Sequence, residues 1–214
     1  MAIKQILFNA EMVRAILDGR KSCTRRLVKN DVEAVLNSPY HKAHPEVEDK
    51  QIINKLCNPP YQPGDILYVR ETWHKYIKRV GNGESCHLEE FYGYKASVAN
   101  SEDANEPWKP SIHMPKKAAR IWLKVTDVRV ERLKDITPKD AENEGVGNLF
   151  YEDIGYSEKN YGTEVDPEYG IAKEQFAWLW ESTIKKSDID RYGWSANPWV
   201  WVIGFERCEK PEGV

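Results

Sequence analysis

The spacing of apolar residues predicts a strand followed by a helix at the N-terminus. An apolar opening strand is formed by Ile3, Ile6, Leu7 and Phe8, and Val13, Ile16 and Leu17 then follow at helical spacing. Asn9 stands where an N-cap residue is expected, and Gly19 stands where a helix typically ends. The helix is therefore expected to end where a basic segment begins.

Two later segments alternate between apolar and polar residues as strands do. In residues 66–73, period-two geometry places Glu71 on the same face as apolar neighbours, including Trp73. Residues 118–133 show the clearest alternation, but its phase changes near Thr126 and Asp127. Because a slip of one residue exchanges the two faces of a strand, we expect a β-bulge or a sharp bend there.

The rest of the chain is expected to fold around these segments as one domain spanning residues 1–214. Helices are predicted from Thr137 to about Gly145 and over residues 172–184, and strands over residues 91–98 and 199–205. Exposed loops are expected at residues 78–90, 99–110 and 146–171. Insertions into the domain are expected at residues 29–62, 78–110 and 146–171.

Composition narrows the function classes. The chain has 31 Lys and Arg residues against 34 Asp and Glu residues, and a net charge of −3, so it is not expected to coat nucleic acid by bulk electrostatics. Any nucleic-acid contact must be local. Its abundant aromatic residues suit a compact barrel core and, less commonly, stacking platforms for bases.

Cysteine usage and hydropathy point to a soluble cytoplasmic protein. The four cysteines lack paired metal-ligand spacing and follow no secretory signal, so we expect free thiols in a reducing compartment. His41 and His44 with Cys57, or Cys86 with His87, match no recurrent ligand pattern, and we expect no metal and no cofactor. No apolar run approaches the ~20 residues that span a bilayer. The oligomeric state stays open.

Two short segments carry the candidate chemistry. The run from Gly19 to Arg26 holds Lys21 and Thr24, and the run from Tyr68 to Trp73 holds Glu71. Together they offer a cation, a hydroxyl and a carboxylate to a single cleft. A site of this kind requires the basic turn to face Glu71 across an opening that solvent can reach.

Several motifs resemble those of the ASCH domain family, whose members are PUA-like β-barrels. The family signature, G-x-K-x-x-T-x-R in the threonine-bearing branch, is met by Gly19, Lys21, Thr24 and Arg26, with Thr24 where many members carry Glu. The chain is most similar to longer ASCH proteins encoded by phages and prophages. The shared runs are Pro63-Gly64-Asp65, Arg70-Glu71-Thr72-Trp73, Ser111-Ile112-His113-Met114-Pro115, Val128-Arg129-Val130-Glu131-Arg132-Leu133 and Asn197-Pro198-Trp199-Val200-Trp201.

This resemblance implies an α+β fold, a PUA-like mixed β-barrel with flanking helices and inserted loops. It also implies that the protein recognises RNA or a modified pyrimidine nucleoside in a basic cleft. One bacterial branch of the family hydrolyses the amide of N4-acylated cytidine with a Lys, a Thr and a Glu, and Lys21, Thr24 and Glu71 match those roles by motif position. Those hydrolases are much shorter than this chain, so the insertions here can reshape or cover the cleft.

Amide hydrolysis needs a nucleophile, a base and donors for the oxyanion. In the hypothesis, Thr24 or a water that it holds attacks the acyl carbon while Lys21 acts as general base. Glu71 orients Lys21 or relays a proton to the leaving amine, and backbone N–H groups near the helix end stabilise the oxyanion. A neighbouring Arg25 or Arg26 would lower the pKa of a partly desolvated Lys21.

Other readings use the same residues differently. In a non-catalytic RNA-binding module, cations contact phosphates and aromatic rings hold an unstacked base. A ribonuclease and a phage accessory or assembly protein are further alternatives. Residues expected to contact RNA or substrate are Gly19, Arg25, Arg26, Arg70, Trp73, His113 and Arg120.

Each of these residues also has a purely structural reading. The basic segment can be a solvated stretch after a helix end, and Glu71 can pair with Arg70 or Arg120. Trp73 and His113 can be packing residues.

Overall fold

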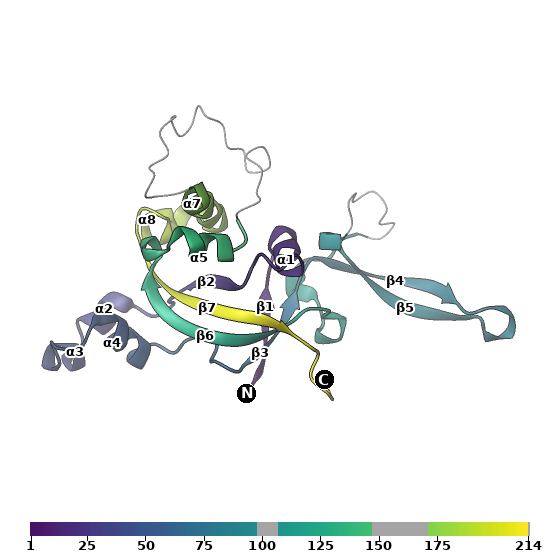
Figure 1. Cartoon of the computed structure of the whole chain (residues 1–214), viewed down its shortest axis with the longest axis horizontal. Coiled ribbons are helices and arrows are strands. Elements are labelled where there is room, and N and C mark those ends of the chain that lie inside the picture. The colour runs from purple at the N-terminus through teal and green to yellow at the C-terminus, as the bar shows by residue number, and fades with distance from the viewer. Residues whose placement is uncertain (98–106, 147–170, 214) are drawn as a thin grey trace, which may run out of the picture. The chain divides into compact units, whose positions relative to one another are not determined.

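The computed structural model describes residues 1–97, 107–146 and 171–213, which form a mixed α+β structure (Figure 1). The chain divides into two compact units. The first unit combines residues 1–19, 64–124 and the C-terminal segment from Glu206, and the second combines residues 20–63 and 125–205. The expected loop at 146–171 and most of the one at 99–110 lie outside the described residues.

The main helices and strands follow one another along the chain. They are β1 (Ile3–Leu7), α1 (Ala10–Leu17), β2 (Cys23–Leu27), α2 (Val32–Leu36), α3 (Pro39–Ala43), α4 (Asp49–Leu56), β3 (Ile66–Arg70), β4 (Trp73–Val80), β5 (His87–Tyr94), β6 (Trp122–Arg132), α5 (Pro138–Asn143), α7 (Ile171–Thr183), α8 (Ile189–Tyr192) and β7 (Trp199–Cys208).

The strands form one five-stranded sheet, in the order β1-β3-β6-β7-β2, and one two-stranded sheet of β4 and β5. A barrel closes only when the first and last strands of a sheet pair with each other. Here β1 and β2 end the hydrogen-bonding order, so the strands of the described ranges form no closed barrel. The expectation of a mixed β-barrel is therefore wrong, whereas the α+β class is confirmed.

In the first unit, the N-terminal strand and helix form where the apolar spacing predicts them. The Asn9 side chain accepts a hydrogen bond from the Met12 N–H, and Gly19 adopts a left-handed φ of +73° just after α1. Strand β1 pairs in parallel with β3, and β3 pairs antiparallel with the start of β6, so that Leu67 lies opposite Leu123. Both of these leucines are fully buried.

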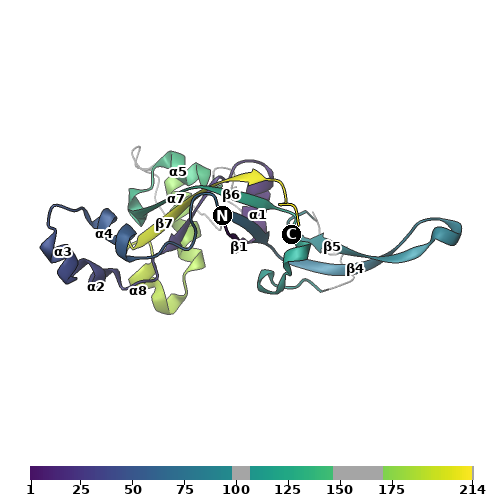
Figure 2. The ribbon, with the colours of Figure 1, turned by 90° about the horizontal axis from the view of Figure 1, so that it is seen from below.

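Strands β4 and β5 form a twisted two-stranded ribbon (Figure 2). The loop predicted over residues 78–90 is confined to residues 81–86, because β4 runs to Val80 and β5 begins at His87. The strand predicted over residues 66–73 is likewise two strands, with the chain leaving β3 after Arg70. Gly93 of β5 leaves room for the His74 ring, since a Cβ at this position would lie 1.9 Å from His74 Nε2.

In the second unit, helices cover one face of the strand pair β2 and β7 (Figure 1). The two strands are antiparallel, with Leu27 opposite Val200. Val200 and Val202 pack with Phe176 and Trp180 of α7 in one apolar cluster. The predicted helices at 137–145 and 172–184 are confirmed as α5 and α7, and the predicted strand at 199–205 is confirmed and extended.

The expected insertion at residues 29–62 contains three short helices of the second unit. Asp31 caps α2 and Ser38 caps α3 through side-chain hydrogen bonds, and α4 buries Ile52 and Ile53. In β6, Val125 and Val130 are buried while Thr126 and Asp127 are exposed, so the burial phase changes where predicted. The bulge itself stays a prediction.

Candidate functional site

The residues expected to form one site belong to both units. Lys21 and Thr24 belong to the second unit, and Glu71 to the first. The residues expected to bind RNA or substrate divide in the same way, with Arg25 and Arg26 in the second unit and Gly19, Arg70, Trp73, His113 and Arg120 in the first.

Lys21 forms a buried ion pair with Glu144, a residue that sequence reasoning missed. The Lys21 ammonium lies 2.7 Å from Glu144 Oε2 and also donates to the Glu144 carbonyl oxygen at 2.8 Å. The side chains are 0% and 3% exposed. Glu144 follows α5 at its C-cap, and its backbone forms a β-bridge with Lys21. No local pattern could have revealed a pair 123 residues apart.

Arg25, in β2, pairs with the same carboxylate. Its Nη1 lies 3.2 Å from Glu144 Oε1, and its Nη2 lies 3.4 Å from Glu131 and 3.7 Å from Asp140. The Arg25 side chain is 0% exposed, and its guanidinium lies over the Phe176 ring. The reading of Lys21 and Arg25 as a solvated basic stretch is therefore wrong.

Thr24 and Arg26 lie on the opposite face of β2, because neighbouring residues in a strand alternate. Arg26 Nη1 donates to Thr24 Oγ1 at 2.8 Å and to the Arg25 carbonyl oxygen at 2.9 Å. Burial lowers the pKa of Arg26, an effect that Glu144 and Tyr61 oppose. Lys21 and Arg25 meet at Glu144, whereas the Thr24 hydroxyl meets Arg26 on the other face.

In the first unit, Glu71 forms a bidentate ion pair with Arg120, as its structural reading predicted. The Arg120 Nε and Nη2 atoms lie 2.8 Å and 2.9 Å from the two carboxylate oxygens, and Glu71 is 1% exposed. Arg120 Nη1 also donates to Ser97 Oγ at 2.7 Å. Its guanidinium lies 4.1 Å from the centre of the Tyr94 ring. Burial raises the pKa of Tyr94, and Arg120 opposes that rise.

Three other residues of the first unit that were expected to contact RNA or substrate, Arg70, Trp73 and His113, differ in their burial and partners. Trp73 is 6% exposed and packs with Met114 and Ala118, so its ring belongs to an apolar cluster, as its structural reading predicted. The Arg70 guanidinium donates to the Gln5 side chain and to the Ile112 carbonyl oxygen. His113 is exposed in a short 3₁₀ turn, Ser111–His113.

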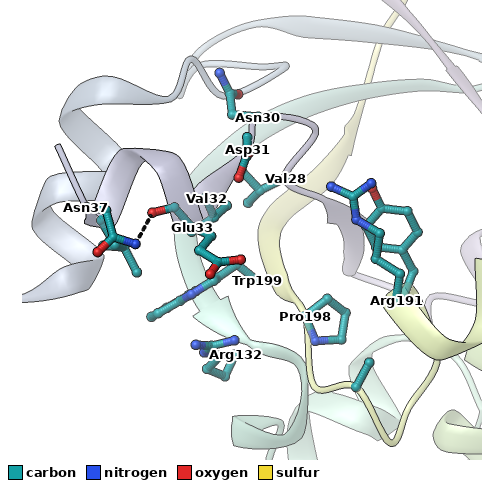
Figure 3. Close-up of a pocket in the computed structure, with 13 residues that line it drawn as sticks. Val28, Asn30, Asp31, Val32, Glu33, Asn37, Arg132, Arg191, Pro198 and Trp199 are labelled. Carbon is teal, nitrogen blue, oxygen red and sulfur yellow. Dashed lines mark hydrogen bonds between the residues drawn. The ribbon is translucent and has the colours of Figure 1, made fainter.

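The second unit also holds a pocket that sequence reasoning missed. Its cavity volume is about 420 Å³, and it lies where α2, α8 and the start of β7 meet (Figure 3). Arg132 and Trp199 come from two runs that carry the family resemblance, and that was the available signal. The lining residues are Val28, Asn30, Asp31, Val32, Glu33, Leu36, Asn37, Arg132, Arg191, Tyr192, Ala196, Pro198 and Trp199.

An arginine that lies over a tryptophan ring forms part of this pocket. The Arg132 guanidinium carbon lies 4.4 Å from the centre of the Trp199 ring. Trp199 is 8% exposed, and its indole nitrogen is buried without a hydrogen-bond partner within the described part of the chain. The ring therefore backs the guanidinium, and Arg132 is the group better placed to meet a ligand.

The charges that line the pocket balance one another. Asp31 and Glu33 come from the start of α2, and Arg132 and Arg191 supply two positive charges. Figure 3 shows Asp31 and Glu33 on the α2 side and Arg191 across the pocket from them. Such a pocket attracts neither polyanions nor polycations strongly, and it offers hydrogen-bond donors and acceptors on opposite walls.

The described ranges hold neither a cluster of metal ligands nor a helix that could span a membrane. Those residues contain no group of three or more His, Cys, Asp or Glu side chains arranged to hold a metal ion. None of the helices in these ranges combines the length and apolar composition needed to cross a membrane.

Comparison with known proteins gave no match to a protein-family model, a curated protein or a solved structure.

The buried ion pair predicts a large loss of stability on removing Glu144. Glu144→Ala leaves Lys21 and Arg25 buried without their shared carboxylate, which is expected to lower the free energy of unfolding by about 3–5 kcal/mol. Glu142→Ala on the same helix is the control, because its partner Lys139 is exposed and such pairs contribute less than about 1 kcal/mol. Urea denaturation measures both variants, and equal losses would contradict the assignment.

The surroundings of Cys23 predict a thiol that resists ionisation. Burial raises the pKa of Cys23 from 9.0 to about 12, and Glu144 adds to this rise. Because the folded-state pKa is the higher one, the stabilisation is complete below pH 9 and is lost as pH rises toward 12. Stability should therefore fall across that range relative to Cys23→Ala.

Alkylation at pH 8 followed by mass spectrometry gives a second readout. Cys86, which is exposed, should be labelled, and Cys23 should be labelled only after unfolding. Rapid labelling of native Cys23 would contradict this assignment.

Proposed function

We propose that the second unit binds a nucleoside, or an unpaired base of RNA, in the pocket formed by Arg132, Trp199 and the α2 carboxylates. The observation that carries this proposal is that the Arg132 guanidinium lies over the Trp199 ring at the wall of the pocket. Guanidinium planes and aromatic rings are the surfaces on which proteins stack unpaired bases. The ASCH resemblance points to the same ligand class.

The size of the pocket supports a ligand of this class. Pockets for small molecules and cofactors enclose about 300–1,000 Å³, and this one encloses about 420 Å³. Its polar groups also suit the edge of a base. Carboxylates accept hydrogen bonds from exocyclic amines, while arginine donates to ring nitrogens and carbonyl oxygens.

The balance of charge favours an uncharged ligand over a phosphate-rich one. Asp31 and Glu33 offset the two arginines, so the pocket lacks the excess of positive charge that holds an RNA backbone. A free nucleoside or a single extruded base therefore fits better than a continuous strand. Binding is expected to change little with salt concentration.

Removing the Arg132 guanidinium should weaken nucleoside binding. Base stacking on protein side chains contributes about 1–3 kcal/mol, so Arg132→Ala is expected to weaken binding of cytidine or N4-acetylcytidine at least fivefold in titration calorimetry. Arg132→Lys keeps the charge but loses the planar group, and it should weaken binding similarly. Arg79→Ala, an exposed arginine of the ribbon, is the control for loss of charge.

Two results would overturn this proposal: no binding of any nucleoside or short single-stranded RNA by the unaltered protein, or full binding by Arg132→Ala. A steep loss of RNA affinity with salt would indicate binding through the backbone instead. Strand cleavage on a gel would favour the ribonuclease alternative. If the protein is an accessory or assembly protein, we expect neither binding nor cleavage.

Hydrolysis of an N4-acylcytidine amide is the second candidate. Its support is that Thr24 accepts, rather than donates, a hydrogen bond from Arg26. The hydroxyl proton of Thr24 is therefore not used in that bond. In this proposal Thr24, or a water it holds, attacks the acyl carbon, and its proton passes to the leaving amine as the C–N bond breaks.

Substitutions at Thr24 test hydrolysis without removing a buried charge. Thr24→Val deletes the hydroxyl at nearly constant volume and should abolish release of acetate from N4-acetylcytidine, whereas Thr24→Ser should retain it. Product is measured by chromatography, with Lys21→Ala as a further variant. Hydrolysis is rejected if the unaltered protein releases no acetate, or if Thr24→Val is as fast as the unaltered protein.

A further inference from the structure

The turn that leads into β7 contains a residue in an uncommon backbone conformation. Asn197 has a φ of +49°, and among the described residues it is the only one other than glycine with a positive φ. Residues with side chains rarely adopt this region, although Asn tolerates it better than most. Such conformations persist only where surrounding contacts hold them, and they gather at functional sites.

The contacts of Asn197 join this turn to the end of β6. Its Oδ1 accepts a hydrogen bond from the Lys134 N–H at 2.8 Å, and its carbonyl oxygen accepts one from Arg132 Nη1 at 3.1 Å. The next residue, Pro198, accepts a hydrogen bond from the Leu133 N–H at 2.9 Å. Consecutive residues at the end of β6 are thus all tied to Asn197 and Pro198.

These contacts constrain Arg132 from two sides. One nitrogen of its guanidinium is held by the Asn197 carbonyl, and the guanidinium carbon lies over the Trp199 ring, two residues further along. Arginine has many rotatable bonds, and its ordering on binding a ligand costs conformational entropy. A guanidinium already held in the pocket avoids most of that cost.

We infer that Asn197 is a positioning residue that fixes Arg132 against Trp199 before a ligand enters the pocket. Its left-handed backbone lets a single residue accept hydrogen bonds from both Arg132 and Lys134. The side-chain bond to Lys134 anchors the turn, and the anchored carbonyl then orients Arg132. The effect on ligand affinity rests on the proposed function, whereas the effect on Arg132 does not.

The test compares variants that separate the side chain of Asn197 from its backbone conformation. Asn197→Gly adopts the left-handed region freely but lacks Oδ1. Asn197→Asp tolerates the same region and keeps an oxygen that accepts from Lys134. Ser195→Gly, at an exposed position of the same turn, is the control for added backbone freedom.

The first readout needs no ligand. Protons on the Arg132 side chain lie over an aromatic ring, so their NMR signals should be displaced upfield in the unaltered protein. Asn197→Gly should lose at least half of that displacement, while Asn197→Asp and Ser195→Gly should retain it. An unchanged displacement in Asn197→Gly, or an equal loss in Ser195→Gly, would overturn the inference.

The second readout is affinity for N4-acetylcytidine. Asn197→Gly should bind at least threefold more weakly, and Asn197→Asp should restore binding to within twofold. If the unaltered protein binds no nucleoside, the proposed function fails while the NMR comparison still decides the role of Asn197. If Asn197→Gly binds normally despite a displaced Arg132, the contribution to affinity is refuted.

Discussion

The ion pair of Lys21 and Arg25 with Glu144 is the contact on which the second unit depends. Charged side chains that are removed from water remain charged only when partners compensate the lost hydration. Here a single carboxylate at the end of α5 meets two cations from the segment around β2, at 2.7 Å and 3.2 Å. This pairing sets where α5 lies against the strand, and the apolar cluster of α5, α7 and β7 packs on the same face.

That arrangement also decides which polar groups of the basic segment can act together. Because Arg25 turns toward Glu144, Thr24 and Arg26 occupy the other face of β2, as strand alternation requires. The pocket lies further along the same strand pair. The last hydrogen bond between these segments runs from the Val28 N–H to the Trp199 carbonyl oxygen, and both residues line the pocket. The pocket therefore forms where the pairing of β2 and β7 gives way to α2 and to the turn at Asn197.

In the first unit, a buried carboxylate is likewise compensated by a cation, with Glu71 paired to Arg120. Glu71 is almost unexposed at the break between β3 and β4, and the planar guanidinium of Arg120 satisfies both of its oxygens. The same guanidinium covers Tyr94 and reaches Ser97, so one side chain ties the ribbon to the segment that precedes β6. A two-stranded ribbon is marginally stable alone, which makes this anchorage important for its order.

Local features of this protein could be predicted from the sequence, because they depend on neighbours in the chain. Asn9 and Thr137 cap helices, and the alternation around Thr126 changes phase where the apolar pattern does. The partners of the charged residues could not be predicted. Glu71 and Arg120 are 49 residues apart, and Lys21 and Glu144 are 123 residues apart. A charge has no periodicity that identifies its partner, and only the folded chain decides which carboxylate meets which cation, whether a sheet closes, and where a pocket remains.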